Sequence, residues 1–269
     1  MARSKYKPLS FSTTMRNPER MASFLKCISK YENEVLTNEI IMEIVRAVIR
    51  EKLYKPNYIS NVPKYKNIYN DPEEMFSDED LEDIIKNSPQ KHKEFGFEAG
   101  WPSRFDTWYK LSMEFGFVYY AMDEQIVISD IGKMLIKAID QENADEQLIQ
   151  NVFLNSMMKY QIKNPFRKNL NDNVPLLLLL QVINRLKKEN NESAGIFRQE
   201  LSFFICWPDN DADSLFSYIK EFRENLRFGE YTDEIIYDAC LEILGADVTD
   251  RNYFKMEQIT GEAIDEYIR

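Results

Sequence analysis

Apolar residues recur at helical spacing near the start of the chain. Asn17 can serve as an N-cap and Pro18 as the first helical residue. One apolar face follows at i, i+3, i+4 and i+7, formed by Met21, Phe24, Leu25 and Ile28. Thr37 or Asn38 can cap a second helix. Its buried stripe is predicted to be Ile41, Ile44, Val45, Val48 and Ile49.

The next segment changes character. Residues 54–72 contain three prolines and many Asn and Tyr residues, which favours a loop. Ser77 then opens the acidic stretch SDEDLEDIIK. Its carboxylates fall in the first turn, where the helix dipole favours negative charge. We therefore interpret these acids as part of a helix N-terminus.

Residues 100–139 carry the most informative pattern. A helix is predicted over 103–115, with an apolar face of Phe105, Trp108, Leu111 and Phe115 and an end at Gly116. The runs FVYYA and QIVIS, separated by MDE, predict a β-hairpin. A further helix follows from Ser129 or Asp130. Helix, hairpin and helix is the order around the wing of a winged helix, which makes 103–115 the expected recognition helix.

The polar side of this helix supplies candidate DNA contacts. On a helical wheel Asp106, Thr107, Lys110 and Glu114 oppose the apolar face, and Arg104 borders it. Arg104, Thr107 and Lys110 can reach base edges or phosphates. The two acids can accept from a cytosine amino group or repel phosphate. A structural helix and hairpin without DNA binding is the alternative interpretation.

The second half of the chain is predicted to be helical. PLLLLLQVINRL reads as a helix buried on almost all sides, since five leucines are consecutive. Further helices are expected at 195–205, 212–225, 231–244 and from Gln258 to Arg269. We predict a mainly α protein with winged-helix-like subdomains (helix-turn-helix plus β-hairpin) in two packed units. The first unit is residues 1–165, with the winged helix at about 100–140, and the second is 166–269.

Charge is distributed unevenly along the chain. The net charge is −11, yet residues 1–30 carry a local balance of +6. Lys5, Lys7, Arg16 and Arg20 in this stretch are candidate phosphate contacts. The three cysteines match no metal or redox spacing, which fits a reducing cytoplasm. No apolar run is long enough to span a membrane.

Motifs for metal-dependent or nucleophilic chemistry are missing from the sequence. No lysine has Asp or Glu two residues before it, so the (D/E)xK half of a PD-(D/E)xK nuclease core is absent. No phosphate-binding loop, CxxC or HExxH occurs. Asp209 to Asp213 starts like a calcium loop but lacks its later ligands, so we interpret it as a polar turn that caps the next helix. We predict no catalytic residue, no metal site and no cofactor in this chain.

Several segments resemble a known protein family. Ser10 to Arg20, Ser103-Arg104-Phe105-Asp106-Thr107, Phe115 to Val118, Ser129 to Leu135 and Asp265 to Arg269 resemble the AlwI family of type II restriction endonucleases. The type IIS and nicking relatives BstNBI, PleI and MlyI share weaker forms of the middle motif. The resemblance extends over essentially the whole chain.

The resemblance implies a function in DNA recognition. In this family, winged-helix-like subdomains in the N-terminal half bind a short asymmetric site in double-stranded DNA. A separate PD-(D/E)xK domain then cuts nearby with Mg²⁺. The resemblance also adds Ser103 to the candidate DNA contacts. We expect this chain to lack the nuclease, to need Mg²⁺ only in that missing domain, and to work with a nuclease domain or subunit. A winged-helix transcriptional regulator remains the main alternative, and a nuclease with an unfamiliar site is a third.

The basic N-terminal stretch generates a prediction about salt. Each phosphate neutralised adds about −0.9 to the slope of log K against log salt. Replacing both Arg16 and Arg20 by alanine should flatten this slope and weaken binding to all DNA sequences alike. Fluorescence anisotropy over a range of salt concentrations measures both effects. An unchanged slope would mean that these arginines pair with acids such as Glu19 instead of phosphates.

Overall fold

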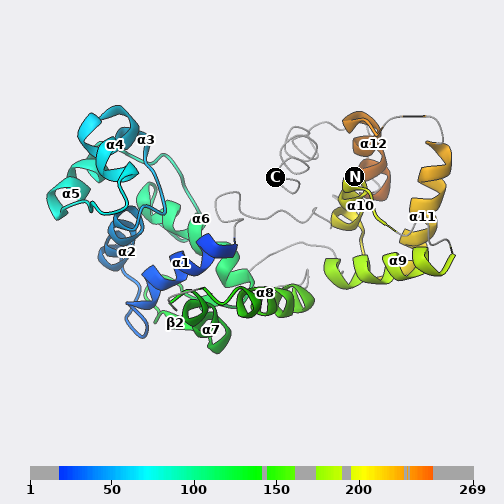
Figure 1. The fold of residues 1–269 in the computed structure, drawn as a ribbon, viewed down its shortest axis with the longest axis horizontal. Coiled ribbons are helices and arrows are strands. Elements are labelled where there is room, and N and C mark those ends of the chain that lie inside the picture. The colour runs from blue at the N-terminus through cyan, green and yellow to red at the C-terminus, as the bar shows by residue number, and fades with distance from the viewer. Residues whose placement is uncertain are drawn as a thin grey trace. The chain divides into compact units, whose positions relative to one another are not determined.

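The computed structural model describes residues 18–140, 144–160, 174–189, 195–226, 229 and 231–244. These residues are mainly helical and include one two-stranded antiparallel sheet (Figure 1). The chain divides into two compact units, whose described parts run from Pro18 to Leu154 and from Asn155 to Leu244. The predictions for residues 5–14 and for the helix from Gln258 lie outside the described residues.

The first unit contains most of the described elements. Its helices and strands are α1 (Pro18–Ser29), α2 (Asn38–Arg50), α3 (Asn57–Asn61), α4 (Pro63–Asn70), α5 (Asp78–Lys86), α6 (Trp101–Glu114), β1 (Val118–Tyr119), β2 (Val127–Ile128) and α7 (Asp130–Ile139). Helix α8 (Glu146–Lys159) crosses the division between the units. Helix α6 begins two residues earlier than its sequence predicts.

The core of the first unit is formed by α1, α2 and α6, with α7 against α1 (Figure 1). The predicted stripes of α1 and α2 are buried, which confirms their helical spacing. The Thr37 hydroxyl caps α2 by accepting from the Ile40 amide. Ser129 caps α7 by accepting from the Gly132 amide. Both caps satisfy amides that a helix leaves without an internal partner.

The predicted hairpin is confirmed, and a third segment joins it. Val118 pairs with Ile128, and Tyr119 pairs with Val127. The segment between α1 and α2 runs antiparallel to the residues before β2, through a bridge between Val35 and Gln125. Within this bridge the Leu36 amide donates to the Glu124 carbonyl at 2.8 Å. Backbone pairing therefore holds the hairpin against the connection between the first two helices.

The loop predicted for 54–72 is wrong, because this stretch contains α3 and α4. Pro63 takes the first turn of α4, where its missing N–H costs nothing. Ile59, Tyr65 and Ile68 are buried and give the two helices an apolar side. The many polar residues of the segment lie on its exposed side. Prolines and asparagines thus mark helix boundaries here.

The second unit is a cluster of short helices. Its elements are α9 (Pro175–Glu189), the 3₁₀ turn η2 (Arg198–Glu200), α10 (Leu201–Cys206), α11 (Ala212–Asn225) and α12 (Asp233–Leu244). The predicted helix 195–205 is wrong in its first three residues, since helical structure begins only at Arg198. The predicted capping turn is confirmed, because Asp211 accepts from the amides of Asp213 and Ser214.

The prediction that α9 is buried on almost all sides is also wrong. Its buried residues form one stripe, Pro175, Leu178, Val182 and Leu186. Leu180 is half exposed, although it belongs to the run of leucines. The helix packs against α10 and α11 on this one side within the second unit. Hydrophobic composition alone therefore overstated its burial.

A buried ion pair holds the second unit together. Glu200 is fully buried, and its carboxylate accepts from Arg223 of α11 at 2.7 Å. The Tyr231 hydroxyl donates to the same carboxylate at 3.0 Å. Glu200 also accepts from the Phe197 amide at 2.9 Å. This carboxylate thus links η2, α11 and the chain before α12.

We expect Arg223→Met to destabilise the second unit by about 3–5 kcal/mol, because it leaves a buried carboxylate without its cation. Hydrogen exchange read by mass spectrometry should show lost protection in α10 to α12 and unchanged protection in α1 and α2. The control is Arg185→Met, since Arg185 pairs with Asp213 at the surface. Equal effects of the two substitutions would contradict the central role of Glu200.

Candidate nucleic-acid interface

Most of the surface of helix α6 is enclosed. Ten of its residues are buried, and the others form a half-exposed stripe at a spacing of three: Arg104, Thr107, Lys110 and Met113. We call these four residues the α6 stripe. Three of them are the residues for which the sequence predicts base or phosphate contact. Any ligand that touches α6 from solvent therefore meets these side chains.

Aromatic packing fixes the inner side of α6. Trp108 lies in the core, with the rings of Phe24 and Tyr54 at centroid distances of 5.7 and 4.9 Å. Phe105 packs against Tyr109 and Tyr120 at 4.8 and 5.1 Å. Contacts of this kind orient the rings as well as bury area. They set the direction in which the α6 stripe points.

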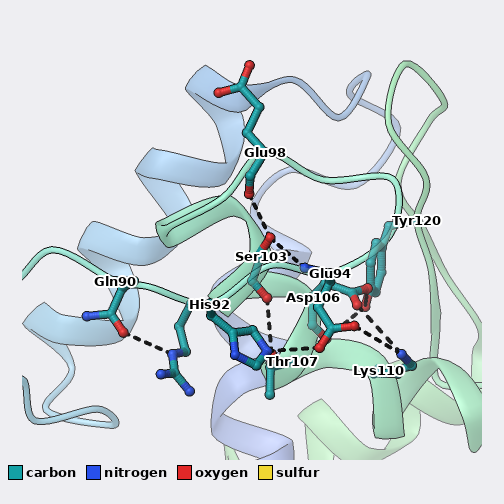
Figure 2. Close-up of polar contacts among 10 residues, drawn as sticks. Gln90, His92, Glu94, Glu98, Ser103, Asp106, Thr107, Lys110 and Tyr120 are labelled. Carbon is teal, nitrogen blue, oxygen red and sulfur yellow. Dashed lines mark hydrogen bonds and ion pairs between the residues drawn. The ribbon is translucent and has the colours of Figure 1, made fainter.

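The acids expected on the polar side of α6 lie inside instead. Asp106 and Glu114 are 6 % and 5 % exposed. The Tyr120 hydroxyl donates to the Asp106 carboxylate at 3.0 Å, and Lys110 lies 4.0 Å away (Figure 2). Burial raises the pKa of Asp106, and the positive charge of Lys110 and the Tyr120 hydrogen bond oppose this rise. The predicted face was wrong for these two residues because the helix is buried over a wider arc than its apolar residues cover.

Ser103 anchors the loop before α6. It is fully buried, its hydroxyl donates to the Glu98 carbonyl at 2.7 Å, and it accepts from the Glu94 amide at 2.9 Å (Figure 2). Thr107 in turn donates to the Ser103 carbonyl at 3.0 Å. A role for Ser103 in direct DNA contact stays a prediction. In the described conformation its hydroxyl holds the loop to the helix.

Side chains of the same loop reach the α6 stripe. His92 Nε2 and Glu94 Oε1 are 2.8 Å apart, and Lys110 Nζ lies 3.6 Å from the other Glu94 oxygen (Figure 2). The Gly100 amide donates to the His92 carbonyl at 2.8 Å. Gly100 has a φ of 106°, which favours glycine at the junction with α6. The loop and the stripe thus form one connected surface.

Arg104 joins this surface to an open pocket of about 440 Å³. The lining is Tyr54, Asn57, Tyr58, Asn61, Asn87, Ser88, Pro89, Gln90, Lys91 and Arg104. The Arg104 Nε donates to Gln90 at 3.0 Å, and its guanidinium lies 6.0 Å from the centre of the Tyr54 ring. The lining holds two cations and no acid. This pocket was not predicted from the sequence, because Tyr54, Asn57, Tyr58 and Asn61 were assigned to a loop.

The predicted N-terminal contacts are described only in part. Lys5, Lys7 and Arg16 lie outside the described residues. Arg20 is exposed at the start of α1, and its guanidinium donates to the Leu53 carbonyl. Of the four predicted N-terminal contacts, Arg20 is thus the one that the structure places. Its hydrogen-bond partner, Leu53, is the residue before Tyr54 of the pocket wall.

Comparison with known families identifies the chain. A model of the AlwI restriction endonuclease family matches residues 113–259, which is more than half of the sequence. The chain belongs to the AlwI restriction endonuclease family. The match includes the hairpin and the helices from α7 to α12. No curated protein matches the chain. Membership of the AlwI family supports a function in DNA restriction, with DNA as the partner.

Restriction endonucleases with a PD-(D/E)xK core use Mg²⁺ to cut DNA. A chain of the AlwI family that cuts DNA in this way needs side chains that can hold the ion. Among the described residues, no group of three or more His, Cys, Asp or Glu side chains could hold a metal ion. These residues therefore do not fit the ion. Within the same residues, no helix has both the length and the apolar character needed to cross a bilayer.

The burial of Asp106 predicts a pH-dependent stability. Its pKa in the folded chain is raised above the ordinary value of 3.8, so the folded state binds the proton more tightly than the unfolded state. The wild type should therefore gain stability relative to Asp106→Asn as the pH falls from neutrality through the raised pKa toward 3.8. Urea denaturation over this pH range measures the difference.

The control for this experiment is Glu34→Gln, which neutralises an exposed acid of the same unit. Its stability should follow that of the wild type across the same pH range. A constant difference between the wild type and Asp106→Asn would contradict the prediction.

Proposed function

We propose that this chain is a sequence-specific recognition module for double-stranded DNA in a type II restriction system, and that it reads DNA with a winged helix. The recognition helix in this proposal is α6. The DNA site is short and asymmetric, as in type IIS enzymes. The observation that carries the proposal is the α6 stripe, a row of polar and basic side chains on an otherwise enclosed helix.

The order of elements supports a winged helix. A winged helix has three helices, a short strand between the first two, and a hairpin after the third. Here α1, the bridge at Val35, α2, α6 and the β1–β2 hairpin follow that order. The bridge segment pairs beside β2, and β2 pairs with β1. Residues 51–100 are then an insertion between the second and third helices.

The chemistry of the α6 stripe supports contact with DNA. Arginine can form two hydrogen bonds with guanine, and lysine and threonine can reach bases or phosphates. Asp106 and Glu114, which would repel phosphate from this face, are buried. The stripe is therefore free of exposed acids along α6 itself. The nearby Glu94 is partly neutralised by Lys110 and lies within hydrogen-bonding distance of His92.

The cutting activity belongs, in this proposal, to a separate nuclease domain or subunit that carries Mg²⁺. No lysine of the chain has Asp or Glu two residues before it. The described residues also do not fit a metal ion. Recognition and cleavage are therefore assigned to different polypeptide segments.

Single-base readout tests the proposal. The site is first selected from a random duplex pool, and a panel of single-base variants is then titrated with the wild type, Arg104→Ala, Thr107→Ala and Lys110→Ala. We expect Arg104→Ala to lose discrimination at one base position, by about 1–3 kcal/mol, while preferences elsewhere persist.

The matched control is Lys137→Ala, which removes an exposed cation from α7. This control should keep the order of preference among the duplexes. If all three stripe variants also keep that order, α6 has a structural role only and the reading element lies elsewhere. A chain that binds all duplexes equally would contradict sequence-specific recognition.

A cleavage assay tests the assignment of the nuclease. Supercoiled plasmid that contains the selected site should stay intact when incubated with the purified chain and Mg²⁺ or Mn²⁺. The expected result follows from the missing (D/E)xK motif. Cleavage that co-purifies with the chain and disappears when one of its carboxylates is replaced would overturn the assignment.

A further inference from the structure

We propose that the pocket beside Arg104 holds one nucleotide of the bound DNA, with the base unstacked from its neighbours. The proposal rests on the proposed DNA recognition and names the part of the substrate that this pocket takes. It concerns a site that shares Arg104 with the α6 stripe and is otherwise formed by the chain around α3 and the turn after α5.

The charge of the pocket lining supports this proposal. The chain has 45 acidic residues, yet none lines this pocket. Lys91 and Arg104 both do. Asp83 is not part of the lining, and it accepts hydrogen bonds from Tyr65 and Asn87 at 2.6 and 3.0 Å. The lining therefore favours an anionic ligand and disfavours a cationic one.

One hydroxyl group of the lining has no hydrogen-bond partner in the described part of the chain. Ser88 lines the pocket and is 9 % exposed, and its Oγ has no hydrogen-bond partner among the described residues. A buried polar atom without a partner costs free energy in the folded chain. The Oγ itself is closed off from solvent, so a ligand with a donor or acceptor edge can satisfy this hydroxyl once the side chain rotates toward the pocket. Ser88 is thus a polar group that the fold itself does not use.

The aromatic and carboxamide groups of the lining indicate the shape and chemistry of the ligand. Tyr54 and Tyr58 offer aromatic rings, on which bases stack. Four carboxamide side chains line the pocket. Asn87 and Gln90 already form hydrogen bonds within the fold, and the other two, Asn57 and Asn61, can pair with base edges through a donor and an acceptor at once. A deoxynucleotide, with about twenty non-hydrogen atoms, is of the size that pockets of this volume hold. A planar base with an attached phosphate matches all three features.

The pocket is continuous with the α6 stripe. Arg104 belongs to the α6 stripe and to the pocket lining. Its hydrogen bond to Gln90 fixes the guanidinium between the two. A DNA strand that passes the α6 stripe therefore comes within reach of the pocket. Removing a base from the stack costs free energy, which contacts in the pocket would offset.

The experiment uses the full chain and the selected duplex. Abasic nucleotides and single mismatches are placed at each position in turn, and binding is measured by anisotropy. At one position an abasic nucleotide should weaken binding by the wild type about tenfold, because the stacked base is lost. A mismatch at the same position should strengthen binding, because the base leaves its partner more easily.

Ser88→Ala is the main variant. It should weaken binding to the intact duplex about threefold to tenfold through one lost hydrogen bond, and match the wild type when that nucleotide is abasic. Its unfolding midpoint should not fall, since the Oγ has no partner in the fold. Ser112→Ala is the matched control, because Ser112 is also buried with an unpartnered Oγ and lies outside the pocket. The control should bind every duplex like the wild type.

Tyr58 supplies a second test that does not depend on Ser88. Tyr58→Ala should lose the response to the abasic position, whereas Tyr58→Phe should keep it, because stacking needs the ring and not the hydroxyl. Titration with the four free deoxynucleoside monophosphates separates the two sources of a nucleotide. Weak or absent binding of the free nucleotides is expected when the pocket takes its base from DNA.

The outcomes separate this proposal from the proposed function. If the wild type binds specifically but both Ser88→Ala and Tyr58→Ala treat all duplexes like the wild type, the pocket proposal fails and DNA recognition stands. A uniform loss at every position would place backbone, and no base, in the pocket and would also overturn it. If the wild type binds no DNA, the proposed function fails, and the pocket proposal fails with it even where a free nucleotide binds.

Discussion

The enclosure of helix α6 is the constraint on which the described surface of the first unit depends. Its aromatic side packs on α1, α2 and the hairpin, and the loop before it covers a further side. Burial of so many large side chains stabilises one rotational setting of the helix. What remains for solvent is a stripe about one residue wide. The position of that stripe is therefore determined by the core.

Electrostatics follow from the same enclosure. The chain is strongly acidic as a whole, which would oppose DNA. Asp106 and Glu114 lie inside, and Lys110 stays at the surface near Asp106 and Glu94. Arg104 is held by Gln90 and lies near the Tyr54 ring. Local geometry thus produces a basic surface on an acidic protein.

The sequence predicted elements whose signal is local. The stripes of α1 and α2, the helix start at Ser77 and the hairpin depend on neighbouring residues, and all were predicted. Thr37 and Ser129, which cap α2 and α7, were each one of two predicted candidates. Features that depend on distant contacts were missed. The burial of Asp106 requires Tyr120, and the pocket requires α3, the turn after α5 and α6 to meet. Arg104, Thr107 and Lys110 were found because their spacing on one helix is itself local.

The segment between α2 and α6 has a consequence for how such a chain can change. It has apolar contacts of its own, through Ile59, Tyr65, Ile68 and Phe76, and it returns the chain to α6 at Gly100. Its exposed residues can vary without disturbing the seam between α1, α2 and α6. The segment is thus exchangeable beside a fixed helix where Tyr54, which packs on Trp108, is retained. Under the proposed function, grafting it between related chains offers a way to alter preference for a flanking nucleotide while α6 stays as it is.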